Sequence, residues 1–133
     1  MNSTYWINRI MSTMYPSSNA TGFYLGLSST KPTAAGGNVS EPSGNNYARV
    51  QITAFTTPAN GVVKNKSAIS FPQSTGIWFP ATAKASYWVL FDGSGSSANV
   101  LSSGAITEPT IVWTGAVITI AKESISITLR DGE

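Results

Sequence analysis

Residues 86–97 read Ser-Tyr-Trp-Val-Leu-Phe-Asp-Gly-Ser-Gly-Ser-Ser, and this stretch decides the fold. Its first six residues alternate along an extended chain and carry apolar side chains on both faces, with Trp88 and Leu90 on one of them. Its last six residues are rich in glycine and serine, which favour a hairpin loop. The stretch therefore predicts a strand in the centre of a sheet, followed by a reversal of the chain.

Shorter alternating segments lie on both sides of this central strand. We predict further strands over residues 23–27, 47–52, 68–71, 99–106, 110–113, 116–121 and 124–129. Turn residues separate them at intervals of about 8–12 residues, a spacing typical of antiparallel β-sandwiches and jelly rolls. The sequence therefore predicts one mainly-β domain over residues 1–133, with about eight strands in an antiparallel sandwich or jelly roll over residues 23–129.

The N-terminal segment departs from the strand pattern. Its apolar residues recur at a spacing of three and four, which predicts a short helix within residues 1–16: Trp6, Ile7, Ile10, Met11 and Met14. Asn2 or Ser3 can cap the start of this helix, and Pro16 ends it. Two interpretations of the apolar face stay open. It docks on the sandwich, or it contacts a neighbouring subunit through Trp6, Ile10 and Met14.

A long loop over residues 28–46 holds three glycines and two prolines. A loop of this length without secondary structure is uncommon and often functional. Arg49, in the strand that follows, either pairs with Glu41 and pins the loop to the sheet or lies exposed. We predict that the helix and this loop carry much of the contact between subunits. The loop and its flank supply further candidate interface residues: Pro32, Glu41, Pro42, Tyr47 and Arg49.

The chain contains no histidine and no cysteine. A Ser-His-Asp triad, a Cys-His pair, a disulfide framework and ordinary zinc sites are therefore impossible. Neither a Walker loop nor a Rossmann glycine pattern is present, so we expect no cofactor and no metal. The residue inventory predicts a protein that is not an enzyme.

Two kinds of chemistry stay open as alternatives. A glycosidase needs only a pair of carboxylates, for which the candidates are Glu41, Asp92, Glu108 and Glu123. A carbohydrate-binding protein needs an exposed aromatic face, and Trp78 is the candidate anchor because it lies in a loop. Its alternative role is to plug the end of the sandwich. Trp88 and Trp113 lie in apolar strand patterns, so we expect both in the core.

Charged residues are scarce, at 11% of the chain, and give a net charge of +2. The cations are scattered rather than clustered in a basic stripe, so no nucleic-acid partner is expected. No segment approaches the ~20 apolar residues of a membrane span, and the N-terminus lacks the features of a signal peptide. We therefore expect synthesis in the cytoplasm. A weakly charged surface suits contact with copies of itself or with other proteins.

The chain resembles a family of small virion proteins of tailed bacteriophages, described as tail-fibre or minor structural proteins. The resemblance covers most of the chain. Glu-Pro-Ser-Gly at residues 41–44 followed by Tyr-Ala-Arg at residues 47–49 is its most specific part. Other matching pieces, in order, are Tyr-Leu-Gly-Leu-Ser at 24–28, Lys-Pro-Thr at 31–33, Ile-Ser-Phe-Pro at 69–72, Trp78, Leu-Phe-Asp at 90–92 and Gly-Ala-Ile at 104–106. Residues 75–85 depart from the family pattern.

The resemblance implies a non-enzymatic structural protein of a phage virion, in the tail, baseplate or fibre region. Its expected partners are other virion proteins and copies of itself. Two alternatives remain. The chain is a capsid decoration protein on the head, or it is a carbohydrate-binding module that contacts a host-surface glycan. The resemblance implies no catalytic residues.

Overall fold

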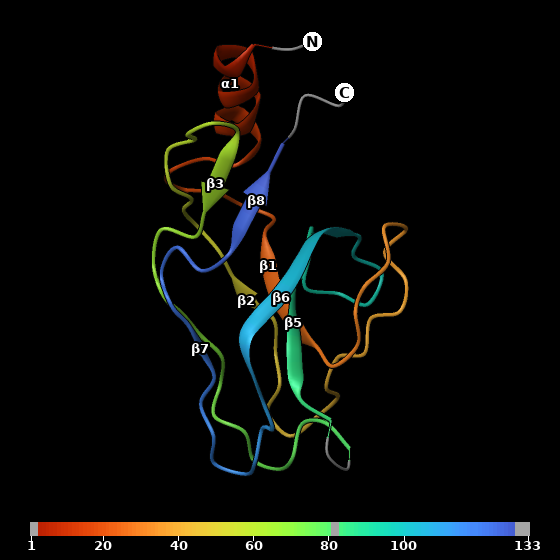
Figure 1. Cartoon of the computed structure of the whole chain (residues 1–133). Helices are drawn as coiled ribbons and strands as arrows, with labels where there is room; N and C mark the ends of the chain where they lie inside the picture. The colour runs from red at the N-terminus through yellow and green to blue at the C-terminus, as the bar shows by residue number, and fades with distance from the viewer. Residues whose placement is uncertain (1–2, 81–82, 130–133) are drawn as a thin grey trace. The chain divides into compact units, whose positions relative to one another are not determined.

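A computed structural model describes residues 3–80 and 83–129 of the chain (Figure 1). These residues form one helix and eight strands, so the prediction of a mainly-β fold with antiparallel sheets and a short N-terminal helix is confirmed. The elements are α1 (Thr4–Met14), β1 (Tyr24–Ser28), β2 (Val50–Gln51), β3 (Val62–Lys64), β4 (Ile69–Ser70), β5 (Ala85–Phe91), β6 (Val100–Thr110), β7 (Thr119–Ile120) and β8 (Ser126–Thr128).

The chain folds into two compact units, each built from separate stretches of sequence. Unit 1 comprises Met1–Thr21, Ile52–Ile69 and Ile120–Glu133, and unit 2 comprises Gly22–Gln51 and Ser70–Thr119. β4 and β7 pair as a two-stranded sheet, and the boundary between the units falls within both strands. The single domain expected from the sequence stays a prediction.

Unit 2 contains a four-stranded antiparallel sheet with the order β2-β1-β5-β6, and Figure 1 labels all four strands. β5 lies between β1 and β6, which confirms the central strand predicted from residues 86–91. Its side chains Trp88, Val89 and Leu90 are buried, as are Leu25 and Leu27 of β1. Apolar side chains on both faces therefore hold the centre of this sheet.

The edge strands of unit 2 differ from the predicted ones. The strand expected over 47–52 is reduced to β2, because the Leu27 amide of β1 donates to the Tyr47 hydroxyl instead of to a backbone carbonyl. The strand expected over 99–106 extends to Thr110 through an irregularity between Ala105 and Thr110. β6 therefore absorbs the start of the strand expected over 110–113.

The rest of that segment is irregular and leads into a turn at residues 114–115, and the expectation that Trp113 is a core residue is wrong. Buried Ser74 holds the turn, because its hydroxyl donates to the Trp113 carbonyl and accepts from the Ala116 amide. The Ser74 carbonyl also accepts from the Gly115 amide, at 2.8 Å. The backbone is satisfied there, while the Trp113 side chain is 61% exposed.

Unit 1 is formed by α1 and the antiparallel pair β3–β8 (Figure 1). β3 was not expected from the sequence, although Asn60-Gly61 precedes it and is a strong hairpin signal. Both residues have positive φ, 52° and 75°, and the Gly61 amide donates to the Asn8 side chain of α1 at 2.7 Å. A side chain at Gly61 would meet the Leu129 carbonyl oxygen at 2.6 Å, so glycine is required.

The predicted helix is confirmed as α1. Ser3 is its N-cap, with its side-chain oxygen accepting from the Trp6 amide at 3.1 Å, whereas Asn2 lies outside the described residues. Its apolar residues divide between two environments. Ile7 and Met11 are buried in unit 1, while Trp6 and Met14 are 49% and 54% exposed. The buried residues fit docking of the helix on its own chain, and the exposed residues are free to contact a neighbouring subunit. Both interpretations of the apolar face therefore stay open.

Gly104 of β6 lies directly opposite Trp88 of β5, and a Cβ there would lie 2.6 Å from the indole ring. We expect Gly104→Ala to lower the free energy of unfolding by about 1–3 kcal/mol, because the well-packed indole has to shift. Gly95→Ala is the matched control, since a Cβ at Gly95 meets nothing within 4 Å. Urea denaturation measures both changes, and equal stability of the two variants would contradict the prediction.

Candidate functional site

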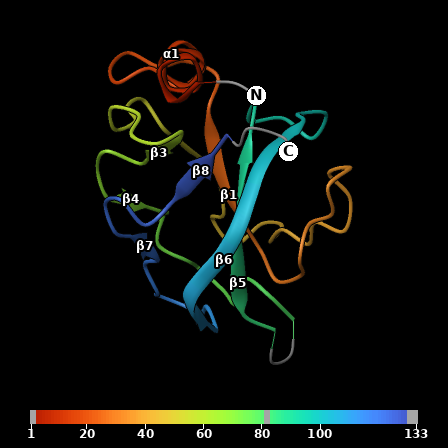
Figure 2. The ribbon, with the colours of Figure 1, turned by 45° about the horizontal axis from the view of Figure 1, so that its top comes forward.

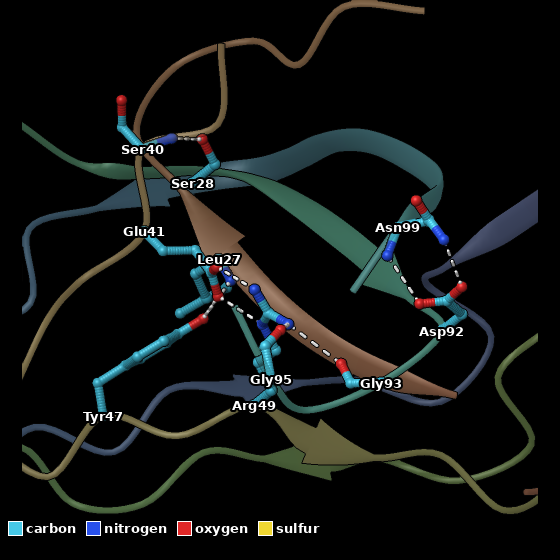
Figure 3. A network of polar contacts seen from close by, with 10 residues as sticks. All are labelled: Leu27, Ser28, Ser40, Glu41, Tyr47, Arg49, Asp92, Gly93, Gly95 and Asn99. Atoms are coloured by element: carbon cyan, nitrogen blue, oxygen red, sulfur yellow. Dashed lines mark hydrogen bonds and ion pairs between the residues drawn. The ribbon is translucent and has the colours of Figure 1, made fainter. Parts of the chain in front are cut away.

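The main polar cluster of unit 2 is a clamp made by Glu41, Tyr47 and Arg49, which we call the Glu41 clamp (Figure 3). Glu41 lies in the long loop after β1, and Arg49 directly precedes β2. Arg49 Nη2 and Nε donate to the two carboxylate oxygens of Glu41 at 2.7 and 3.1 Å, which is a bidentate pair. The Arg49 and Glu41 side chains are only 11% and 19% exposed. Of the two alternatives left open for Arg49, pairing with Glu41 is therefore the one found in the structure, and exposure is not.

Tyr47 completes the clamp and joins it to the sheet. Its hydroxyl donates to Glu41 Oε2 at 2.5 Å and accepts from the Leu27 amide of β1 at 3.1 Å. Burial and the adjacent Glu41 carboxylate raise the pKa of Tyr47 far above its usual value of 10.0. The phenol therefore stays protonated and can act as the donor that the carboxylate requires.

Arg49 also reaches the hairpin that follows β5. Its Nη1 donates to the carbonyls of Gly93 and Gly95 at 3.1 and 2.8 Å, and its guanidinium carbon lies 3.5 Å from the centre of the Phe91 ring. One side chain thus binds a carboxylate, two carbonyls and an aromatic face. Only arginine offers the planar set of donors that can do this.

The clamp lies over Gly26, at the centre of β1. A Cβ on Gly26 would lie 2.7 Å from Glu41 Oε2, 2.8 Å from the Tyr47 hydroxyl and 3.0 Å from the Phe91 ring. Glycine is needed here for close approach rather than for backbone conformation. The Tyr-Leu-Gly-Leu-Ser strand and the Glu-Pro-Ser-Gly…Tyr-Ala-Arg segment are therefore two halves of one feature.

The loop that carries Glu41 is ordered by its own hydrogen bonds. Buried Ser28 accepts from the Ser40 amide at 3.0 Å (Figure 3). It also accepts from the Thr30 amide at 3.2 Å. The Thr30 hydroxyl in turn donates to the Asn38 carbonyl. These bonds replace a sheet ladder for this segment, which explains how a long loop without secondary structure keeps a defined course.

The hairpin of residues 92–99 closes on a second polar contact, from Asp92 to Asn99 (Figure 3). The Asp92 carboxylate accepts from the Asn99 side-chain amide at 3.0 Å and from its backbone amide at 2.7 Å. These bonds lower the pKa of Asp92. Asp92 is thus a turn residue, and no group of three or more metal-ligating side chains occurs in residues 3–80 and 83–129.

A family model described as "Podophage GP4 fiber I protein gp80" matches residues 2–128. The chain belongs to this family of phage fibre proteins. No curated protein and no solved structure matches the chain. The family assignment confirms the resemblance to tail-fibre proteins, and it favours a fibre role over capsid decoration or a carbohydrate-binding module.

Three of the predicted interface residues of this fibre protein are buried within their own chain: Pro32, Pro42 and Trp78. Trp78 is 5% exposed, donates its indole N–H to the Asn45 carbonyl at 2.8 Å and meets the Tyr47 ring edge-on. Its interpretation as an exposed sugar anchor is therefore wrong. The Gly-Ile-Trp-Phe-Pro loop turns its tryptophan inward against Asn45, which agrees with the alternative of a buried side chain but names a partner that the sequence did not reveal.

Three other predicted interface residues lie together on α1. Trp6, Ile10 and Met14 line a shallow hollow of about 200 Å³ with Arg9 and Thr13. This surface is mainly apolar: the Arg9 guanidinium donates to the Tyr5 hydroxyl at 3.2 Å, and the Thr13 hydroxyl donates to the Arg9 carbonyl at 3.1 Å. The hollow stays a predicted contact surface for another protein.

No helix within the described part of the fibre protein is long and apolar enough to cross a membrane.

Two of the four carboxylates considered for a glycosidase are bound by other side chains of the same chain. Glu41 is bound by Arg49 and Tyr47, and Asp92 is bound by Asn99. Glu108 lies exposed in β6 of unit 2, while Glu123 lies in a turn of unit 1 with a positive φ of 61°. Glu41 and Asp92, which are both drawn in Figure 3, thus have structural partners.

Replacing Arg49 with alanine tests how much the Glu41 clamp contributes to the free energy of unfolding. We expect Arg49→Ala to lower the free energy of unfolding by about 2–4 kcal/mol, because Glu41 and two carbonyls lose their donor in a mostly buried site. Lys122→Ala, which removes an exposed cation, should change stability by less than about 0.5 kcal/mol. Denaturant titration followed by tryptophan fluorescence measures both. Unaltered stability of Arg49→Ala would show that the clamp does not pin the loop.

The raised pKa of Tyr47 predicts a specific dependence on pH. In the unfolded chain tyrosine ionises near pH 10, whereas folded Tyr47 keeps its proton to higher pH, so stability falls as the pH rises above about 10. Tyr47→Phe removes this contribution and should flatten the decline between about pH 9 and pH 11. It should also cost about 1–3 kcal/mol at neutral pH, because the Leu27 amide loses its acceptor. Tyr5→Phe, at an exposed tyrosine, is the control, and an equal decline in both variants would refute the assignment.

Proposed function

We propose that this chain is a non-enzymatic structural component of the tail-fibre region of a podophage virion, joined to other virion proteins and to copies of itself. The observation that carries the proposal is the family match, which extends over residues 2–128. The match therefore includes both units and the Glu41 clamp, rather than one shared motif. Synthesis in the host cytoplasm and incorporation during assembly belong to this proposal.

The geometry of the polar residues supports a structural role. The most buried charged pair, Arg49 with Glu41, has all its strong donors and acceptors directed at the chain itself. A catalytic pair instead needs at least one group that is free to exchange a proton with a substrate. With no histidine or cysteine in the sequence, few other groups could take that role.

The contact with other virion proteins is proposed to use the hollow on α1. Trp6 and Met14 are large, apolar and about half exposed, and aromatic and methionine side chains are enriched at protein interfaces. Ile7 and Met11, on the buried side of the same apolar stripe, are fixed in unit 1. A helix whose apolar stripe is buried along one side and exposed along the other can therefore be held by its own unit while it contacts a partner.

The position on the particle can be tested directly. We expect antibody-labelled particles to carry the protein at the tail and in few copies, because tail appendages have low closed symmetry. A capsid decoration protein would instead cover the head in roughly hundreds of copies. Immuno-electron microscopy with gel densitometry separates the two outcomes, and labelling of the head alone would refute the fibre assignment.

The role of the α1 hollow can be tested by substitution rather than by deletion of the helix, since Ile7 and Met11 belong to the core of unit 1. We expect the double variant Trp6→Ser, Met14→Ser to fold normally by circular dichroism but to be incorporated into particles at a reduced level. Trp113→Ser is the matched control, because it removes a similarly exposed tryptophan from unit 2. Normal incorporation of the double variant would exclude the hollow as a contact.

A further inference from the structure

β6 leaves one edge of the four-stranded sheet open. The strand runs over 11 residues at one end of the order β2-β1-β5-β6, and among the described residues β5 is its only partner strand (Figure 2). The opposite edge strand, β2, has only two residues. The sheet of unit 2 therefore presents one short edge and one long edge.

The long edge lacks two of the devices that usually prevent pairing with another chain, charge and proline, and its shifts in register against β5 lie near Val100 and beyond Ala105. Proteins protect such edges with charged side chains, proline or bulges. Residues 100–107 contain no charged residue and no proline; the first of each are Glu108 and Pro109. Every second side chain here is exposed, including Leu101 at 43%. An open edge of this kind is a template for a further strand.

The sequence of this edge is nearly symmetric about Ser103. Residues 100–106 read Val-Leu-Ser-Ser-Gly-Ala-Ile, with apolar residues at both ends and small residues between them. In an antiparallel pair, directly opposed residues share a face of the sheet. If the strand pairs with its own copy about Ser103, Leu101 lies opposite Ala105, and Val100 lies opposite Ile106. Each apolar side chain then meets another one.

We infer that the free edge of β6 pairs antiparallel with β6 of a second copy of this chain, with the two-fold axis at Ser103. The two sheets join into one continuous sheet, and the edge amides and carbonyls of both copies gain partners. A second copy is the occupant that this sequence fits, because the lack of charge removes repulsion between identical edges. A different partner strand would not require a symmetric pattern.

Structural features at both ends limit the length of this pairing. At one end, Gly36 of the long loop lies beside Val100, where a Cβ on the glycine would be 3.5 Å from Val100 Cβ. At the other end, the ladder with β5 is irregular between Ala105 and Thr110, and Pro109 lacks an amide to donate. The surface is distinct from the α1 hollow, so this inference extends the proposed function and does not depend on it.

A cross-linking experiment tests the register. The chain has no native cysteine, so an introduced cysteine can form a disulfide only with its counterpart in a second copy. In the proposed pair, two Ser103 residues lie opposite each other with Cα atoms ~4.5–5.5 Å apart, within reach of a disulfide. We expect Ser103→Cys to give a disulfide-linked dimer under mild oxidation. Thr107→Cys is the matched control, because it is exposed on the same strand but would lie ~25 Å from its counterpart. Equal cross-linking of both variants would overturn the register and the pairing.

Sedimentation in solution provides the second readout. We expect the wild-type chain to dimerise, and Leu101→Lys with Ala105→Lys to weaken the dimer about tenfold or more, because like charges then face each other in both symmetric pairs. An equimolar mixture with Leu101→Glu, Ala105→Glu should restore pairing, since opposite charges then meet. A monomeric wild type, or a dimer that the lysine variant leaves unchanged, would refute the inference. Labelling of particles tests the fibre role separately.

Discussion

The bidentate ion pair between Arg49 and Glu41 is the constraint on which the order of unit 2 depends. A mostly buried ion pair has to offset the cost of removing two charges from water, and it does so only when the remaining donors and acceptors are satisfied. Here the Tyr47 hydroxyl supports the carboxylate, while two glycine carbonyls and the Phe91 ring support the guanidinium. The pair therefore fixes the long loop, the start of β2 and the hairpin after β5 at one point.

This arrangement also explains why a weakly charged fibre protein keeps a buried charge. The segments that the clamp joins are loops and a two-residue strand, which have little apolar surface with which to order themselves. A directional network can define their course where packing cannot. The outer surface is left with few charges, which reduces the cost of desolvation when protein surfaces meet during assembly.

The two proposed contacts of the protein follow from the apolar side chains that unit 1 leaves exposed and the strand edge that unit 2 leaves unpaired. In unit 1, α1 buries Ile7 and Met11 and leaves Trp6 and Met14 exposed. In unit 2, β6 pairs with β5 on one side and leaves its other edge open. One surface is a side-chain contact and the other is a backbone contact. A chain with both can join two different neighbours, as a component of an assembled fibre has to do.

The sequence by itself determined the features that depend on local pattern and on inventory. The period-two run at residues 86–91 and the three-to-four spacing in the first helix predicted β5 and α1, because a side chain's face depends only on its position in a regular element. The lack of histidine and cysteine removed most catalytic chemistry, and the Glu-Pro-Ser-Gly…Tyr-Ala-Arg segment indicated the family and one ion pair. Asn60-Gly61 before β3 is a local signal of the same kind, since both residues have positive φ in the turn.

Only the tertiary structure decided which aromatic residues are buried and which edges are free. Trp113 is exposed although the core was expected, and Trp78 takes the inward one of its two alternatives, because burial depends on segments distant in the sequence: the Asn45 carbonyl accepts from the Trp78 indole, and Ser74 holds the turn beside Trp113. The carbonyl partners of Arg49 lie more than forty residues away, at Gly93 and Gly95. Sheet order likewise left β6 at the edge, since strand pairing is set by the packing of the whole unit rather than by the strand's own sequence.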